Sequence, residues 1–326
     1  MRSRYVDRMT DSGRDRTWLV AIATAMWGTD ALWRMPLANS LPSTTVVLCE
    51  HLIVTLLLVP LLPRAWRAFA RCRGRHRAAA LVVGAGTSAL ATMLFTAAFG
   101  YGDPVTPVVL QKLQPVFAAL ASFLLLREGF RRGYLAFALP ALAGAWLLAF
   151  PNPVQVSVSR LMPALLALGA AALWAAGTVL GRVLSRELAP VEVTTLRYSI
   201  GLPTVALVLL LRDGSISEGL SNIGDALAVG WANIGGLLLL ALIPGLLALS
   251  LYYLGLRTTP AARATLAELS FPATAAVVGV GVLGETLTLT QWVGFVLLVA
   301  MITGLGWNER AGDRKVVAPE PALARG

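Results

Sequence analysis

Polar and charged side chains lie within apolar runs of this sequence, close to one proline in each half of the chain. Four of these side chains precede a proline: Gln111, Lys112 and Gln114 before Pro115, and Glu268 before Pro272. A charge near the centre of a bilayer costs about 2.5–3.5 kcal/mol, so it needs a partner or a function. Unlike charges near a membrane midplane suit a zwitterionic or polar solute. We therefore predict that these four side chains line a substrate cavity, with a structural ion pair between Lys112 and Glu268 as the alternative.

The two prolines predict bends in the helices that carry them. Proline lacks a backbone N–H and clashes with the carbonyl four residues earlier, so it kinks a helix and frees that carbonyl. Non-helical backbone at membrane depth is tolerated where it lines a cavity. Pro115 and Pro272 are therefore predicted to be helix kinks beside the cavity.

A tryptophan and an aspartate lie toward the outer end of the first apolar run. Trp27 and Asp30 are followed by Arg34, four residues after the aspartate. Residues with this spacing are neighbours on a helix, so Asp30 and Arg34 can neutralise each other. We include Trp27 and Asp30 in the predicted cavity; the alternatives are a structural ion pair for Asp30 and simple packing for Trp27.

Two titratable residues, Glu50 and His51, lie near the middle of the second apolar run. Arg197 lies in the corresponding run of the second half. A carboxyl group buried in a membrane is either protonated or paired, and such groups form proton relays. Glu50, His51 and Glu268 are therefore candidates for proton coupling, and a structural network of buried polar groups is the alternative.

The composition indicates a membrane protein with many spans. Hydrophobic residues make up 57% of the 326 residues and charged residues 13%, against about 45–50% and about 25% in ordinary soluble domains. The net charge of +10 comes from arginines in short loops and tails, so we expect no nucleic-acid partner. Two cysteines and two histidines in unrelated settings predict neither a disulfide framework nor a metal centre. We expect no cofactor.

The apolar runs predict ten transmembrane helices, because isolated strands cannot satisfy their backbone groups in lipid. The predicted spans are 17–37, 43–62, 78–99, 105–126, 132–150, 161–181, 191–211, 233–256, 261–283 and 289–307. Most of the 27 basic residues then fall in alternate loops and in both tails. The positive-inside rule thus predicts a multi-pass protein of the plasma membrane with both termini in the cytoplasm.

Two similar blocks indicate an internal repeat. One begins at Leu113 and reaches Glu128; the other begins at Ser270 and reaches Glu285. Five spans in each half would insert the halves upside down relative to each other, an arrangement typical of transporters. Glu128 and Glu285 end their spans and are predicted to be structural caps.

The predicted organisation has four parts. A basic cytoplasmic tail occupies 1–16, and the two five-helix repeats occupy 17–150 and 161–307. A cytoplasmic tail follows at 308–326, and its polar composition predicts disorder. The predicted fold class is an all-α membrane protein of ten helices in two inverted repeats.

With its ten spans, the pair Trp27-Gly28 and the two proline–glutamate blocks, the chain resembles the drug/metabolite transporter superfamily, EamA type. The resemblance implies transport of amino acids, other metabolites or drugs, often outward, with the substrate at the centre of the bundle. Members often carry an arginine in the second and seventh spans. Arg197 fits this pattern, whereas Glu50 stands where the other arginine is expected.

The leading hypothesis is alternating-access export of a small polar or amphipathic metabolite by a monomer or homodimer in a lipid bilayer, with protons as a possible coupling ion. A membrane receptor or assembly subunit that transports nothing is one alternative. A membrane-embedded enzyme is another, although the sequence contains no metal-ligand spacing or phosphate-binding glycine motif. We therefore predict a protein that is not an enzyme.

Overall fold

All elements within the described part of the chain are helices. The computed structural model describes residues 16–30, 32–33, 36–37, 41, 43–99, 110, 113–126, 133–150, 152–154, 161–213, 221, 231–282, 284 and 286–317. The helices of the first half are α2 (Thr17–Trp27), α4 (Ser43–Leu57), η1 (Val59–Leu61), α5 (Leu62–Arg71), α6 (Gly74–Leu81), η2 (Val82–Leu90), α7 (Ala91–Phe99), α9 (Gln114–Ala121), η3 (Ser122–Leu126) and α10 (Tyr134–Ala149). Those of the second half are α11 (Leu161–Glu187), α12 (Pro190–Asp213), α14 (Trp231–Leu240), η4 (Ala241–Leu247), α15 (Ala248–Leu256), α16 (Ala261–Ala267), α17 (Ser270–Gly281) and α18 (Leu289–Val317).

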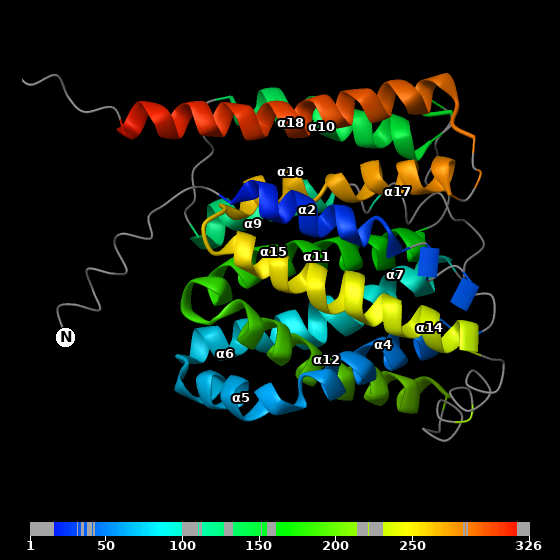
Figure 1. The fold of residues 1–326 in the computed structure, drawn as a ribbon, viewed down its shortest axis with the longest axis vertical. Coiled ribbons are helices and arrows are strands. Elements are labelled where there is room, and N and C mark those ends of the chain that lie inside the picture. Colours follow the sequence, from blue (N-terminus) through cyan, green and yellow to red (C-terminus); the bar gives the residue numbers. More distant parts are fainter. Residues whose placement is uncertain are drawn as a thin grey trace, which may run out of the picture.

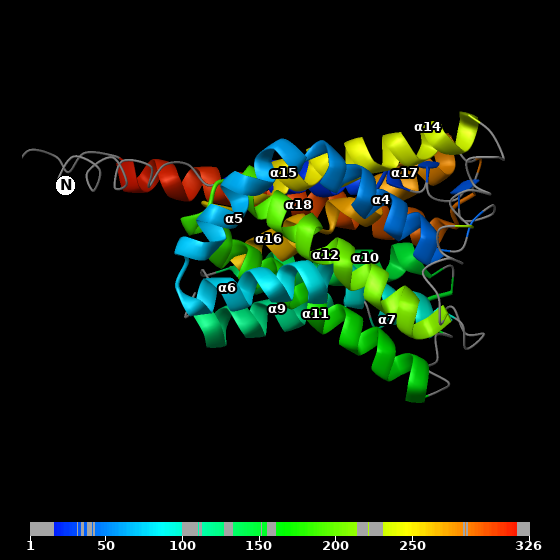
Figure 2. The same cartoon turned by 90° about the horizontal axis from the view of Figure 1, so that it is seen from below.

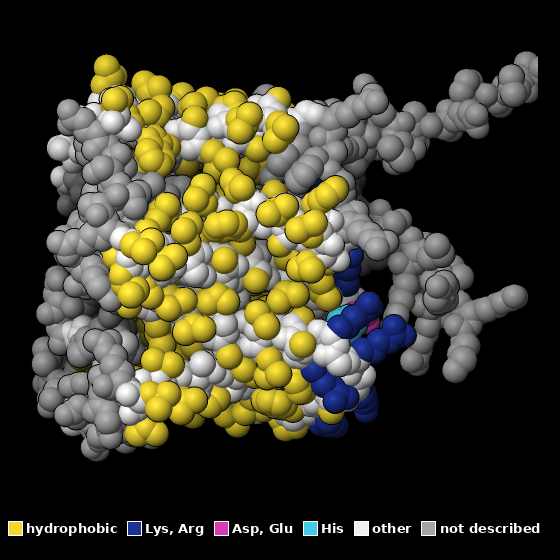
Figure 3. Space-filling view, turned by 180° about the vertical axis from the view of Figure 1, so that it is seen from behind, with side chains coloured by type: hydrophobic (Ala, Val, Ile, Leu, Met, Phe, Trp, Pro, Cys, Tyr) yellow, Lys and Arg dark blue, Asp and Glu magenta, His cyan; other side chains and the backbone are white. Residues whose placement is uncertain are grey.

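Many of these helices are long and apolar enough to cross a bilayer. Among the described residues five qualify singly, and a bent pair, 44–57 with 59–71, makes a sixth. Four shorter apolar helices fall within other predicted spans, at 17–27, 114–126, 135–149 and 289–304. Figure 3 shows a broad hydrophobic surface, and the basic side chains that are drawn on this face lie at one end of it. The all-α prediction is confirmed, while the count of ten spans stays a prediction.

Helices of the first half pack against helices of the second half. Corresponding contacts pair α2 with α15 and α11 with α7, and likewise α4 with η4 and α12 with η2. Figures 1 and 2 show the helices of the bundle running along one direction, and Figure 1 shows α10 and α18 together at one edge. The contacts of α2 with α15 and of α4 with η4 thus correspond to those of α11 with α7 and of α12 with η2, as expected for an internal two-fold repeat.

The first helices of the two halves run in opposite directions. Near the start of α2, Val20 packs against Gly255, close to the end of α15. Near the end of α11, Arg182 donates a hydrogen bond from Nη1 to the carbonyl oxygen of Leu256. The beginning of α2 and the end of α11 therefore lie beside the same end of α15.

Two wide-turned π-helical segments occupy matching places in the halves. When Pro115 is aligned with Pro272, η4 falls on residues 84–90 of η2. Pro244 lies in the middle of η4, where its missing N–H and its ring favour a widened turn. Gly84 lies in η2, and a Cβ there would come within 2.6 Å of the Ile200 Cβ. π-Helical turns often lie at functional sites, which directs attention to the space between these segments.

Three predicted spans are broken or bent where the sequence predicts one helix. Within the 17–37 span, helix α2 ends at Trp27, a turn follows at Gly28, and residues 30, 32–33 and 36–37 are again helical. A Cβ on Gly28 would lie 2.6 Å from the Thr274 Cβ and 2.7 Å from the Phe271 carbonyl oxygen, so glycine permits this close approach. Within the 43–62 span, helix α4 ends at Leu57, and the helical segment that follows, 59–71, is bent by 58° relative to it. Both η1 and α5, which make up this segment, have a proline in their first turn.

The third break lies within the predicted span 261–283. Helix α16 ends at Ala267, and α17 begins at Ser270. Pro272 has no N–H for the Glu268 carbonyl, which accepts a tighter bond from the Phe271 N–H at 3.0 Å instead.

Helix α18 ends later than predicted. It continues to Val317, so the first part of the tail that was expected to be disordered is helical. The helical hydrogen bonds continue through a polar sequence that the hydropathy pattern places outside the span.

Candidate functional site

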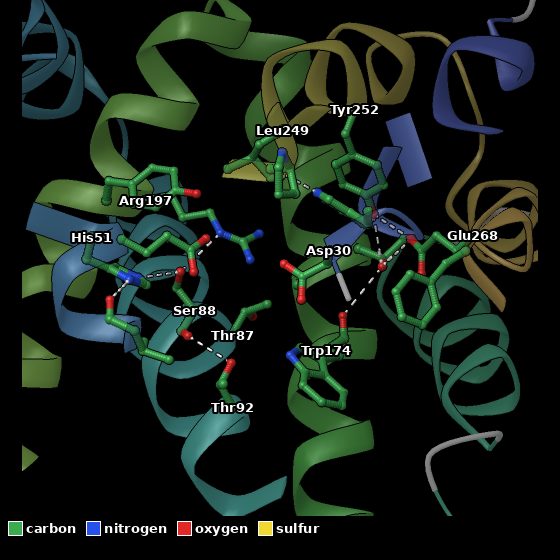
Figure 4. A pocket seen from close by; sticks show the side chains of 18 of the residues that line it. Asp30, His51, Thr87, Ser88, Thr92, Trp174, Arg197, Leu249, Tyr252 and Glu268 are labelled. Carbon is green, nitrogen blue, oxygen red and sulfur yellow. Dashed lines mark hydrogen bonds between the residues drawn. The ribbon is translucent and has the colours of Figure 1, made fainter. Parts of the chain in front are cut away.

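A cavity of about 310 Å³ lies at the meeting point of the two halves. Its walls come from α2, α4, η2, α7, α9, α11, α12, η4, α15 and α17, and from the break between α16 and α17. Figure 4 shows Arg197, His51 and Ser88 on one side and Tyr252 and Glu268 on the other. The volume is at the small end of the range of about 300–1,000 Å³ for ligand pockets.

The structure brings six predicted site residues to this cavity. They are Trp27, Asp30, Glu50, His51, Gln114 and Glu268. Pro115 lies in the first turn of α9, directly after Gln114, and Pro272 lies in the first turn of α17. Four other predicted residues, Gln111, Lys112, Glu128 and Glu285, lie outside the described residues. The functional roles assigned to all of these residues stay predictions.

The Glu268 carboxylate accepts three side-chain hydrogen bonds within the cavity wall. Its Oε1 accepts bonds from the Tyr252 hydroxyl at 2.5 Å and the Thr178 hydroxyl at 2.9 Å. Its Oε2 accepts a bond from Nε2 of Gln114 at 2.9 Å. Because a carboxylate only accepts, the Gln114 amide must present its nitrogen here. One side chain at the α16–α17 break thus connects α9 of the first half with α11 and α15 of the second.

Helix α2 contacts the residues and backbone that surround Glu268. The Thr24 hydroxyl donates to the carbonyl oxygen of Ala267 at 3.1 Å, at the end of α16. Trp27 donates from Nε1 to the carbonyl oxygen of Pro244 at 2.9 Å, inside the π-helical segment η4. The Trp27 ring also lies 5.0 Å from the Tyr252 ring. The first helix therefore supports both the backbone break beside Glu268 and one of its hydrogen-bond donors.

The opposite side of the cavity holds a chain of hydrogen bonds through buried residues. Nε of Arg197 donates to Oγ of Ser88 at 3.3 Å, and Nη1 donates to the Tyr253 hydroxyl at 3.1 Å. Nε2 of His51 lies 3.0 Å from the same Ser88 oxygen, and Nδ1 lies 2.9 Å from the carbonyl oxygen of Val47. The chain links α12, η2 and α4, which belong to both halves.

Sequence reasoning missed several of these residues. Thr178, Tyr252 and Ser88 carry hydroxyl groups without charge, so none of them stands out in an apolar run. One usable signal was present: at the aligned repeat positions Tyr252 matches Phe95, so one copy gains a hydroxyl that the other lacks. Gly177, another residue without charge, packs against Thr87 and lines the cavity.

Carboxyl groups outnumber basic side chains in the described cavity wall. Asp30, Glu50 and Glu268 contribute carboxyl groups and Arg197 a guanidinium. Trp27 and Tyr252 add aromatic surface beside them. This combination suits an amphipathic solute that presents an apolar face together with several hydrogen-bonding groups.

Replacing Thr178 with valine is expected to destabilise the protein by about 1–2 kcal/mol. The substitution keeps the shape of the side chain and removes one hydrogen-bond donor to Glu268. A polar contact between helices in a membrane contributes about 1–2 kcal/mol of stability. The measurement is the apparent melting temperature of purified protein in one detergent. Thr194→Val is the matched control, because its buried hydroxyl bonds only the Pro190 carbonyl of its own helix. An equal loss in both variants would contradict a special role for the Glu268 cluster.

Comparison with known proteins identifies the family of the chain. The EamA-like transporter family matches residues 17–150 and 161–307. The riboflavin transporter ImpX of Fusobacterium nucleatum is 31% identical over 87% of this chain and 95% of its own length. The uncharacterized transporter YwfM of Bacillus subtilis is 28% identical over 64% of this chain and 66% of its own.

The crystal structure of another protein has the same fold. It superposes with a TM-score of 0.68 and 17% identity over 92% of this chain and 99% of its own. The family match confirms the resemblance seen in the paired proline blocks and places the chain in a family of multi-pass membrane transporters, which is not an enzyme family. The chain belongs to the EamA-like transporter family.

Proposed function

We propose that this protein carries a small amphipathic metabolite across the plasma membrane by alternating access around the cavity beside Glu268. The observation that carries the proposal is the carboxylate cluster: Gln114 from the first half and Thr178 and Tyr252 from the second all donate to Glu268. If one half rocks against the other, this cluster must rearrange. A solute bound in the cavity can then bias the equilibrium by interacting differently with the two arrangements.

Riboflavin is the first substrate to test. The relative ImpX is named a riboflavin transporter and matches nearly the whole chain. Riboflavin combines a planar ring with a polyhydroxyl chain, and the cavity offers Trp27, Trp174 and Phe271 together with the polar groups around Glu268. Export is the predicted direction, from the family resemblance.

The proposed topology places ten spans in two inverted repeats with both termini in the cytoplasm. The opposite directions of α2 and α11 support inversion of the halves. The gathering of basic side chains at one end of the hydrophobic surface supports a cytoplasmic assignment for that end.

Proton coupling is a further part of the proposal. Glu50 and Glu268 are half-buried carboxyl groups on the cavity wall, and the buried His51 lies on the same wall. A carboxyl group that exchanges protons while facing alternate sides of a membrane can couple solute movement to a pH gradient. Both ring nitrogens of His51 already lie at hydrogen-bonding distance from protein oxygens. Glu50, Glu268 and His51 are all proposed candidates for coupling.

Purified protein in liposomes is expected to move riboflavin saturably, and an imposed pH gradient is expected to change the rate. The assay follows riboflavin in both directions by counterflow, beside a panel of amino acids, nucleosides and aromatic cations. Liposomes without protein give the background. Flux of another solute without riboflavin flux would revise the substrate alone. Absence of flux for every solute in the panel, from correctly folded protein, would overturn the transport proposal.

A further inference from the structure

The Arg197 guanidinium lies on the cavity wall across from Glu268 (Figure 4). The two hydrogen bonds that the structure gives it both go to neutral hydroxyls, those of Ser88 and Tyr253. A guanidinium carries five N–H donors in a planar fork. A cation in such a setting is stabilised by an acceptor that arrives with a ligand. Arg197 is thus held in place by neutral groups and still has donor capacity toward the cavity.

The direction of the hydrogen bonds behind Arg197 follows from the chemistry of the partners. A backbone carbonyl only accepts, so Nδ1 of His51 carries the proton toward Val47. In the neutral imidazole, Nε2 is then an acceptor and takes the Ser88 hydroxyl proton. The Ser88 oxygen is left with its lone pairs for the Nε–H of Arg197. His51 therefore fixes the hydroxyl orientation that positions the guanidinium.

Close packing holds this histidine in one place. A Cβ on Gly201 would lie 2.9 Å from Cδ2 of His51, so α12 packs directly against the imidazole. The Tyr198 ring of the same helix lies 5.0 Å from the imidazole in an edge-to-face arrangement. Because His51 cannot turn freely, Ser88 and Arg197 are preorganised before a ligand enters.

Aromatic rings flank the space between Arg197 and Glu268. Trp27 and Tyr252 lie together on one side, and Trp174 also lines the cavity with its ring 5.1 Å from Phe95. Aromatic side chains bind flat rings by stacking and by edge contacts. A planar ligand between them would present its edge to the polar groups at the two sides of the cavity.

We propose that Arg197 recognises the carbonyl-bearing edge of a planar heteroaromatic substrate, and that Ser88 and His51 are positioning residues for this contact. The inference rests on the proposed transport function and names the substrate class of that same cavity. A guanidinium fork matches paired acceptors in one plane. The flavin ring has two carbonyl groups on its pyrimidine edge, so riboflavin is the probe.

Riboflavin binding to purified protein in lipid nanodiscs tests the inference, with dissociation constants from fluorescence and carbonyl stretching bands from infrared difference spectra. Wild type is expected to bind and to shift a flavin carbonyl band to lower wavenumber. Arg197→Gln is expected to weaken binding about 10- to 100-fold and to remove the shift. Arg197→Lys keeps the charge without the planar fork and is expected to restore the shift only in part.

The positioning residues have their own readout. Ser88→Ala and His51→Phe are expected to weaken binding about 2- to 10-fold and to move the carbonyl band partway toward its unbound position. Ser199→Ala is the control on the same helix as Arg197, because its hydroxyl bonds only the Leu196 carbonyl. It is expected to bind riboflavin as wild type does, with an unchanged band.

Two results would overturn the inference, and they differ from failure of the proposed function. If folded wild type does not bind riboflavin but transports another solute class, the substrate class is wrong while transport stands. If riboflavin binds and the band shift survives in both Arg197 variants, then Arg197 does not contact the carbonyl edge. Flux measurements on the same preparations separate these results from a general loss of transport.

Discussion

Glu268→Ala is expected to reduce transport about 100-fold and to destabilise the protein by about 2–4 kcal/mol. The substitution leaves donors on three helices without their common acceptor: Gln114, Thr178 and Tyr252. A buried polar group that loses its partner costs about 1–3 kcal/mol of stability. Water that enters the cavity can bond to some of the three freed donors, so the total loss is smaller than three separate costs. The measurements are solute flux in liposomes and apparent melting temperature in detergent.

Glu268→Gln separates the charge from the hydrogen bonds. The amide oxygen of the new glutamine can accept hydrogen bonds from Thr178 and Tyr252. The Gln114 amide can turn so that its oxygen accepts a hydrogen bond from the NH₂ group of the new glutamine. We therefore expect near-native stability with transport as low as in the alanine variant. Glu187→Ala is the control, because Glu187 is exposed and lies away from the cavity. Wild-type flux in both Glu268 variants would show that the carboxylate takes no part in transport.

The site was predictable from sequence where a residue is rare in its setting. A charge such as Glu268 or Glu50 inside an apolar run attracts attention because membrane insertion penalises it. Prolines such as Pro272 also stand out, because they remove a specific helical bond. The repeat then related Pro272 to Pro115 and focused the prediction on the residues just before them.

Other parts of the site arise only from packing. A lone threonine or tyrosine is ordinary in a membrane helix, and Thr178 becomes significant because α11 brings it against the α16–α17 break. The π-helical segments η2 and η4 have no hydropathy signature. The turn after Trp27 depends on contacts of Gly28 with α17, more than two hundred residues away in sequence. Contacts between the halves decide these features, and a local pattern does not encode them.

The seam between α10 and α18 predicts a large effect of a small residue change. A Cβ on Gly294 would lie 2.6 Å from the backbone nitrogen of Leu148 and 2.7 Å from the carbonyl oxygen of Gly144. These are backbone atoms, so no side chain can move aside. Gly294→Leu is therefore expected to destabilise the protein by about 3 kcal/mol or more, seen as a large drop in apparent melting temperature.

Gly235→Ala is the matched control in α14, because a Cβ there meets nothing within 4 Å. Alanine costs less backbone entropy than glycine in a helix, so this variant is expected to be neutral or more stable by about 0.5–1 kcal/mol. A similar small effect for Gly294→Leu would mean that α10 and α18 do not pack as closely as the structure shows.

The seam also connects to the cavity. Leu298 of α18 belongs to one buried cluster with Leu269 and Ala273, which stand on either side of the α17 start beside Glu268. Separating α18 from α10 should therefore loosen the segment that carries Glu268. We expect Gly294→Leu protein that survives purification at low temperature to transport poorly as well, whereas Gly235→Ala should retain wild-type flux. Loss of stability with fully retained flux would place the α10–α18 pair outside the moving parts of the transporter.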